Sequence, residues 1–116
     1  MARHVIGTVD EIPPGLRKLV TIKGRSIGVF NVGGAYHAVR NLCPHQGAPL
    51  CLGLVGGTAL PSQPGAYVWG RDGEILRCPW HGWEFDLLTG RALFDPHVRV
   101  KTYAVEVQGD QLVLTS

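Results

Sequence analysis

The chain has 116 residues, a formal net charge of +2 and only 17% charged residues, while 16 glycines and 8 prolines indicate many turns. This length suits one domain with one core, and no apolar run approaches the roughly 20 residues that a bilayer span needs. Lys and Arg are scattered, and Arg17-Lys18 is their only adjacent pair, so we expect neither nucleic acid nor a membrane as a partner. Three cysteines, an odd count, suit a reducing compartment and argue against a disulfide framework. We therefore expect a cytoplasmic protein.

Short alternating runs of apolar and polar residues predict an all-β fold, because no segment sustains the period of a helix. A first hairpin is expected at 21–27 with its turn at Lys23-Gly24, and its second strand continues to Gly33-Gly34. A third strand follows at 35–39. In the segment 67–76, Asp72-Gly73 between apolar runs predicts a hairpin turn. The segments 102–107 and 111–115 predict a closing hairpin, and the strands together predict a small antiparallel barrel or sandwich.

Two short segments each combine one cysteine with one histidine. The first contains Cys43-Pro-His45 and the second contains Cys78-Pro-Trp-His81, and a glycine follows each pair. One tight loop can offer a thiolate and an imidazole at this spacing, since glycine permits backbone conformations that are closed to other residues. Two such loops predict a metal site.

The residue types fit two different metal centres. Two cysteines and two histidines can form a tetrahedral zinc site. Zinc-finger ligands, however, usually come as a cysteine pair and a histidine pair, whereas each segment here supplies one of each type. The mixed pairing favours a two-iron cluster in which one iron takes both thiolates and the other takes both imidazoles.

These motifs give the chain a strong resemblance to the Rieske [2Fe-2S] proteins, and most of all to the small Rieske-type ferredoxins of oxygenase systems. The quoted motifs are Cys-Pro-His-Gln-Gly-Ala-Pro-Leu, from position 43, and Cys-Pro-Trp-His-Gly-Trp-Glu-Phe, from position 78. The resemblance implies one Rieske [2Fe-2S] cluster, with Cys43 and Cys78 on one iron and His45 and His81 on the other. It also implies a Rieske-like antiparallel fold with an inserted cluster-binding subdomain.

The resemblance implies how a single domain over residues 1–116 would be divided. We expect a base of about 1–40 and 88–116 and a cluster-binding subdomain of about 41–87. The two motifs are separated by residues 46–77, a longer stretch than in many family members, and the excess is expected to form a loop and hairpin arm at about 54–70.

Four positions near the motifs imply a low reduction potential. Relatives from membrane complexes carry a disulfide between the two motifs, and the matching positions here are Ala48 and Trp80. Those relatives also place hydroxyls where this chain has Trp83 and Phe85. Fewer hydrogen-bond donors to sulfur stabilise the reduced cluster less, so the potential should lie near the low end of the Rieske range, at about −150 mV.

The resemblance implies an electron carrier and not an enzyme. We expect a one-electron shuttle that passes electrons from a flavin-containing reductase to a terminal oxygenase or similar enzyme. Two alternatives remain: a small subunit of a larger reductase, similar to those of nitrite reductases, and a redox-inactive zinc or structural module. Cys51 lies outside both motifs, and we expect a free, partly buried thiol, with an oxidation sensor as the alternative.

Overall fold

The computed structural model describes residues 2–44, 47–60, 68–80, 82–95 and 97–116. Strands dominate this part of the chain, and two short 3-10 turns, η1 (Val9–Glu11) and η2 (Leu50–Leu52), interrupt them. The prediction of an all-β fold is therefore confirmed.

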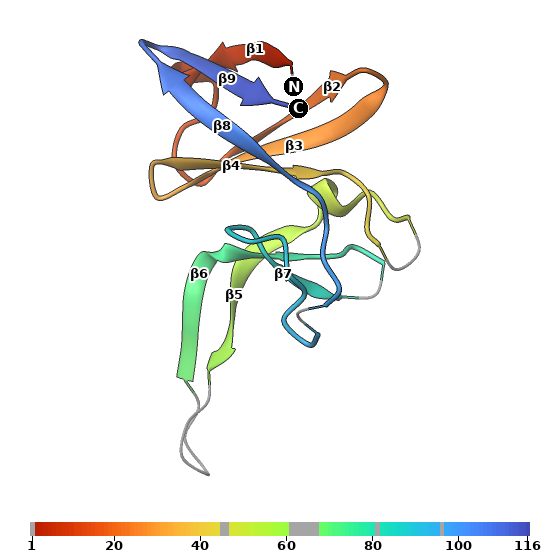
Figure 1. The fold of residues 1–116 in the computed structure, drawn as a ribbon. Helices are drawn as coiled ribbons and strands as arrows, with labels where there is room; N and C mark the ends of the chain where they lie inside the picture. Colours follow the sequence, from red (N-terminus) through yellow and green to blue (C-terminus); the bar gives the residue numbers. More distant parts are fainter. Residues whose placement is uncertain (1, 45–46, 61–67, 81, 96) are drawn as a thin grey trace.

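A six-stranded antiparallel sheet forms the larger, nearly closed part of the molecule (Figure 1). Its strands, in the order β1-β9-β8-β4-β3-β2, are β1 (Arg3–Thr8), β9 (Gln111–Thr115), β8 (Thr102–Gln108), β4 (Ala35–Arg40), β3 (Arg25–Val32) and β2 (Arg17–Ile22). The hairpins predicted at 21–27 and at the C-terminal end are confirmed. Lys23 and Gly24 both have positive φ, at 52° and 76°, as a two-residue turn that matches the twist of the strands requires. Strand β1 has no counterpart among the predicted elements.

A second, three-stranded sheet follows the order β5-β6-β7. It contains β5 (Leu54–Leu60), β6 (Val68–Arg77) and β7 (Glu84–Asp86). Strands β5 and β6 extend away from the rest of the molecule as a two-stranded arm (Figure 1). The predicted arm at about 54–70 thus corresponds to β5 and the start of β6, and its segment 61–67 lies outside the described residues.

The prediction of a hairpin turn at Asp72-Gly73 is wrong. These residues lie inside the continuous strand β6. Gly56 is paired with Ile75 and Thr58 with Gly70, so the register shifts there and leaves extra residues on β6. Gly73 has φ of +84°, and its backbone freedom is used in this bulge and not in a turn. The pairing of β6 with β5 on both sides of Asp72-Gly73 therefore outweighs the local preference of this dipeptide for a turn.

Two clusters of buried side chains form the core. One lies within the six-stranded sheet and includes Ile27, Tyr103 and Leu112. The other lies between that sheet and the three-stranded sheet, and it includes Phe30 from β3, Leu76 from β6 and both motif cysteines. The second cluster thus joins the six-stranded sheet to the two Cys-containing motifs.

No helix in the described ranges is long and apolar enough to cross a membrane.

Gly53 provides a test of how tightly β5 is attached to β6. A Cβ atom at Gly53 would lie 1.8 Å from the carbonyl oxygen of Arg77, whereas one at Gly56 would meet nothing within 4 Å. Gly53→Ala should lower the free energy of unfolding by about 1–3 kcal/mol, because backbone atoms must shift to relieve the overlap. Chemical denaturation measures this loss, and Gly56→Ala is the matched control. Equal stability of the two variants would contradict the packing described here.

Candidate metal centre

The first motif folds as a loop that closes on its own cysteine. The backbone N–H of Cys43 donates to the carbonyl of Ala48 at 2.8 Å, and the N–H of Gly47 donates to the carbonyl of Cys43 at 2.8 Å. Gly47 has φ of +74°, which explains why a glycine stands at this position. The cysteine backbone is thereby fixed by two hydrogen bonds.

The second motif repeats this geometry. The N–H of Cys78 donates to the carbonyl of Trp83 at 2.8 Å, and the N–H of Gly82 donates to the carbonyl of Cys78 at 3.0 Å. Gly82 has φ of +72°, close to the value of its counterpart in the first loop. The two loops are therefore structurally equivalent around their cysteines, although they come from distant parts of the sequence.

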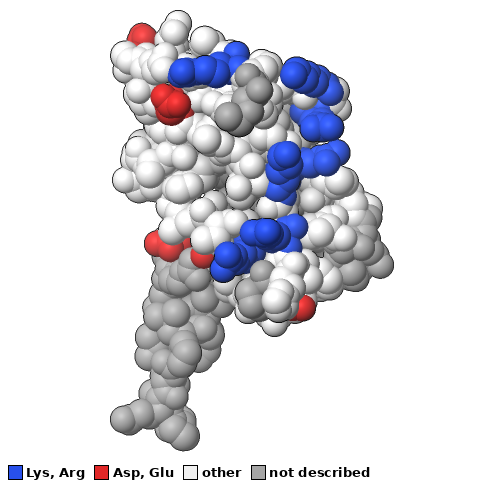
Figure 2. Space-filling view, in the orientation of Figure 1, with Lys and Arg blue, Asp and Glu red and all other residues white. Residues whose placement is uncertain are grey.

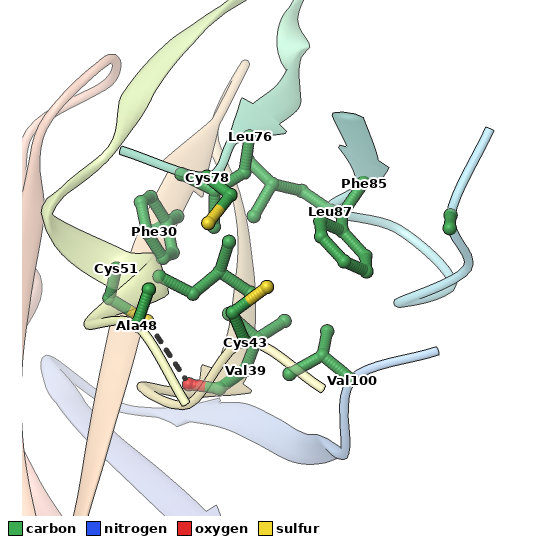
Figure 3. Close-up of a cluster of buried hydrophobic side chains, with 12 residues drawn as sticks. Phe30, Val39, Cys43, Ala48, Cys51, Leu76, Cys78, Phe85, Leu87 and Val100 are labelled. Carbon is green, nitrogen blue, oxygen red and sulfur yellow. Dashed lines mark hydrogen bonds between the residues drawn. The ribbon is translucent and has the colours of Figure 1, made fainter. Parts of the chain in front are cut away.

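Both motif cysteines are buried in the same apolar cluster. Cys43 and Cys78 are each 2% exposed, and their sulfur atoms lie among side chains that include Leu76, Phe85 and Val100 (Figure 3). Thiolates are soft ligands that suit iron–sulfur clusters and zinc. Two buried thiols on two equivalent loops therefore fit a shared metal centre.

The other two predicted ligands, His45 and His81, lie outside the described residues. No group of three or more Cys, His, Asp or Glu side chains that could hold a metal occurs among the residues that the structure does describe. The fit to a metal centre accordingly rests on the two cysteines and on the loops that carry them.

Each loop is closed at its base by a side chain. The Asn41 amide oxygen accepts the backbone N–H of Cys51 at 2.8 Å, which joins the two ends of the first loop. Arg77 and Glu84, paired across β6 and β7, form a salt bridge of 2.5 Å at the base of the second loop. Arg77 is thus engaged within the chain.

Arg17 attaches the base to the segment that follows the first loop. Its guanidinium donates to the carbonyl oxygens of Cys51 at 2.8 Å and Gly53 at 2.5 Å. The same group lies over the ring of Phe30, 5.3 Å from the ring centroid. One side chain of β2 therefore ties η2 and the start of β5 to the six-stranded sheet.

Cys51 is a buried thiol and not a surface group. Its Sγ lies 3.5 Å from the carbonyl oxygen of Val39, to which the thiol donates (Figure 3). A Cβ at Gly28 would lie 2.5 Å from that sulfur, so the missing side chain at Gly28 makes room for the thiol. Burial raises the pKa of Cys51 to about 12, against smaller opposing effects of a Gly28 backbone hydrogen bond and the charge of Arg17. This environment favours the packing role over the oxidation sensor.

Exposed apolar side chains lie on the second loop, beside the first, and in the segment after β7. Trp80 on the second loop is 57% exposed, and Leu42 beside Cys43 is 41% exposed. Phe94, in the segment after β7, is 58% exposed and contacts Trp83 edge to face with ring centroids 4.6 Å apart. An apolar rim of Leu42, Trp80 and Phe94 thus lies on three separate segments.

The family is shown by a match over residues 2–104 to the model of the Rieske [2Fe-2S] domain. The chain belongs to the Rieske [2Fe-2S] domain family. The resemblance inferred from the two motifs and the expected cofactor, one Rieske [2Fe-2S] cluster, are confirmed at the level of the family.

A curated relative and several solved structures support this assignment. The ferredoxin component of the naphthalene 1,2-dioxygenase system of Pseudomonas aeruginosa is 31% identical over 105 residues, which cover 90% of this chain and 86% of the relative. The ferredoxin of carbazole 1,9a-dioxygenase from Nocardioides aromaticivorans IC177 has a TM-score of 0.77 and 24% identity, with 99% of this chain and 98% of that chain covered. This structural likeness confirms the Rieske-like fold.

Two further solved structures resemble the chain in fold. A ferredoxin solved in complex with the oxygenase of carbazole 1,9a-dioxygenase has a TM-score of 0.76 and 23% identity, with 97% of this chain and 92% of that chain covered. A structure titled as a putative NADH-dependent nitrite reductase small subunit from Mycobacterium tuberculosis has a TM-score of 0.74 and 25% identity, with 97% of this chain and 93% of that chain covered.

The environment of Cys51 predicts slow alkylation and a pH-dependent stability. Because the pKa is raised in the folded chain, the contribution to stability is complete below the unfolded value of about 9 and is lost as the pH rises toward 12. Iodoacetamide should leave Cys51 unmodified in the native protein at pH 8 but label it after denaturation, as mass spectrometry of peptides measures. Cys51→Ala should also flatten the fall in stability above pH 9. Rapid labelling of the native thiol would contradict its burial.

Proposed function

We propose that this protein is a one-electron carrier that serves a reductase and a terminal oxygenase or similar enzyme. The observation that supports this most strongly is the pair of equivalent loops that bring Cys43 and Cys78 into one buried cluster. Its relatives are named as ferredoxin components of oxygenase systems, which are electron carriers and not catalytic subunits.

The proposed ligands are the four motif residues. Cys43 and Cys78 would hold one iron, and His45 and His81 would hold the other. When bound, a Rieske [2Fe-2S] cluster accepts and returns one electron at a time. The role of the chain is to hold the ligands in place with the hydrogen bonds at Gly47 and Gly82 and to exclude water from the thiol side.

Rigidity of the loops supports this role. Backbone hydrogen bonds within each loop, the Asn41–Cys51 contact and the Arg77–Glu84 salt bridge all restrict movement of the two cysteines. Ligands that are held in one orientation by their surroundings need little rearrangement when the charge of the centre changes. The surrounding contacts therefore favour rapid and reversible electron transfer.

The apolar rim is the proposed contact surface for redox partners. Leu42, Trp80 and Phe94 are exposed large apolar groups around the loops that carry the ligands. Clusters of this kind mark interaction sites, and small interfaces suit partners that associate and separate quickly. We propose a flavin-containing reductase as the electron donor and the oxygenase as the acceptor.

A second candidate function is a fixed electron-transfer subunit of a larger reductase. The likeness to the structure described as a nitrite reductase small subunit supports it. The two candidates differ in how tightly the partner is held. Affinity purification from the native source at low salt would recover a fixed subunit with a large partner in equal amounts, whereas a shuttle would be recovered alone.

We also propose the division of the domain that the motifs suggest. The base would be about 1–40 and 88–116, and the cluster-binding subdomain about 41–87. The six-stranded sheet contains strands from the first two ranges, and all strands of the three-stranded sheet fall in the third. Arg17 links the two parts.

The ligand assignment predicts different outcomes for the three cysteines. Cys43→Ser and Cys78→Ser should each lower the iron content from about two atoms per chain toward zero, because each removes a thiolate from the same iron. Cys51→Ser is the matched control and should retain iron, since its thiol lies outside both motifs and donates to the carbonyl of Val39. Iron analysis of the purified proteins measures this. Equal losses in all three variants would contradict the assignment.

Trp83 and Phe85, which carry no hydroxyl, predict a low midpoint potential, near about −150 mV. Phe85 is 1% exposed in the cluster that holds both cysteines. Phe85→Tyr should raise the potential by about 40 mV if the new hydroxyl donates about 1 kcal/mol more to the reduced state. Phe85→Leu, which adds no donor, is the control, and protein-film voltammetry measures all three. A midpoint of the unaltered protein well above zero would contradict the low-potential assignment.

A further inference from the structure

Cations that are scattered in the sequence gather on one side of the folded chain. Lys23, Arg25 and Lys101 line one surface hollow, between the β2–β3 turn and the start of β8. Lys101 and Arg99 line a second hollow, and Arg99 is paired with Arg91 in an isolated antiparallel bridge. Figure 2 shows Lys and Arg side chains in a band that runs from the upper right to the middle of this view. These five exposed residues are called the basic strip below.

The basic strip carries charge that the chain does not neutralise. None of its five residues forms a salt bridge within the described ranges, whereas Arg3, Lys18 and Arg77 each pair with a glutamate. The only carboxylate side chain in the segment 91–99 is that of Asp95, which accepts a backbone N–H. A surface with one sign of charge attracts groups of the opposite sign. The strip therefore favours an acidic partner.

Two arginines of the strip lie directly opposite each other. Arg91 and Arg99 are the two partners of the antiparallel bridge, so their side chains lie on the same face. Like charges in this arrangement are destabilising. Gly90 allows the close approach of the two segments, since its φ is +78° and a Cβ there would lie 2.6 Å from the carbonyl oxygen of Val100. A local arrangement that opposes stability is expected where it serves a function.

The strip reaches the buried cysteines. Ala92 and Val100 are 3% and 5% exposed, and both belong to the apolar cluster that contains Cys43 and Cys78 (Figure 3). Successive side chains of extended backbone point to opposite sides. The exposed neighbours of these two buried residues are Arg91, Arg99 and Lys101. Positive charge thus lies one residue away from side chains that pack with the thiols.

The strip also shares a segment with the apolar rim. Phe94 of the rim lies between Arg91 and Arg99 in the chain. Interfaces commonly combine apolar and charged groups, and complementary charges raise the rate of encounter. We propose that the basic strip docks an acidic face of a redox partner and steers that partner to the apolar rim. This inference rests on the proposed function and adds the sign of the charge that the partner presents.

Stopped-flow mixing of the oxidised holoprotein with reduced flavodoxin, a small acidic flavoprotein, tests this proposal. The second-order rate constant of electron transfer should fall about tenfold between about 20 mM and about 500 mM NaCl, because salt screens the attraction. A rate constant that is unchanged or rises with salt would overturn the proposal and leave the proposed function intact. A protein that accepts no electron from dithionite would instead overturn the proposed function, and this inference with it.

A double variant locates the attraction. Arg91→Gln with Arg99→Gln should lower the rate constant about threefold or more at low salt but leave it unchanged at high salt, where the attraction is screened. Arg3→Gln with Lys18→Gln removes the same charge from residues that pair with glutamates, and it is the matched control. Equal losses in the two double variants would show attraction by net charge and overturn the strip. A loss that persists at high salt would show damage to the centre and overturn the docking role.

The melting temperature of the same double variant tests the opposed arginines. Removal of both charges relieves their repulsion, so the melting temperature should rise while the low-salt rate constant falls. A structural role for the two arginines predicts the opposite change in stability. A lower melting temperature would overturn the argument that the pair is kept for binding.

A nucleic acid is the competing class of acidic partner. Fluorescence anisotropy of a labelled single-stranded DNA of about 20 bases at about 150 mM salt should show no binding tighter than about 10 µM. Tighter binding that weakens in the Arg91→Gln, Arg99→Gln variant would overturn the assignment of the strip to a protein partner.

Discussion

The structure depends on one constraint: two thiols from distant parts of the chain must reach the same dry, apolar space. Cys43 follows β4, and Cys78 follows β6, yet both are 2% exposed in one cluster. Both loops meet this constraint with the same backbone conformation. In each, the cysteine N–H and the cysteine carbonyl form hydrogen bonds within a short loop. A glycine with φ above +70° completes each loop. Once the cysteines are fixed in this way, the sheets on either side serve to hold the two loops together.

Attachment of the loops to the base relies on polar contacts to main-chain groups. Arg17 donates to two carbonyls at the start of the second sheet, and Asn41 accepts a backbone N–H across the first loop. Cys51 and Gly28 meet at the same place, since the buried sulfur occupies space that a side chain at Gly28 would fill. The third cysteine is thus explained by packing, whereas the two motif cysteines are the proposed metal ligands.

Sequence reasoning predicted what depends on local patterns and missed what depends on distant contacts. The Lys23-Gly24 turn and the closing hairpin follow from residues that are adjacent in the chain, and the structure confirms them. The turn expected at Asp72-Gly73 fails because the pairing of β6 with β5 outweighs the dipeptide signal. Arg17 carried no local signal, since its acceptors are main-chain carbonyls more than thirty positions away. The four ligands could be proposed from the sequence because each motif keeps its cysteine and histidine within four residues, and they stay a prediction.

The most direct test of the central claim is an electron paramagnetic resonance spectrum of the anaerobically purified, dithionite-reduced protein, together with iron and zinc analysis. A rhombic Rieske-type signal with about two irons per chain is the result that the paired cysteine loops predict. No signal and about one zinc per chain would contradict the electron-transfer account and leave a structural metal module in a Rieske fold.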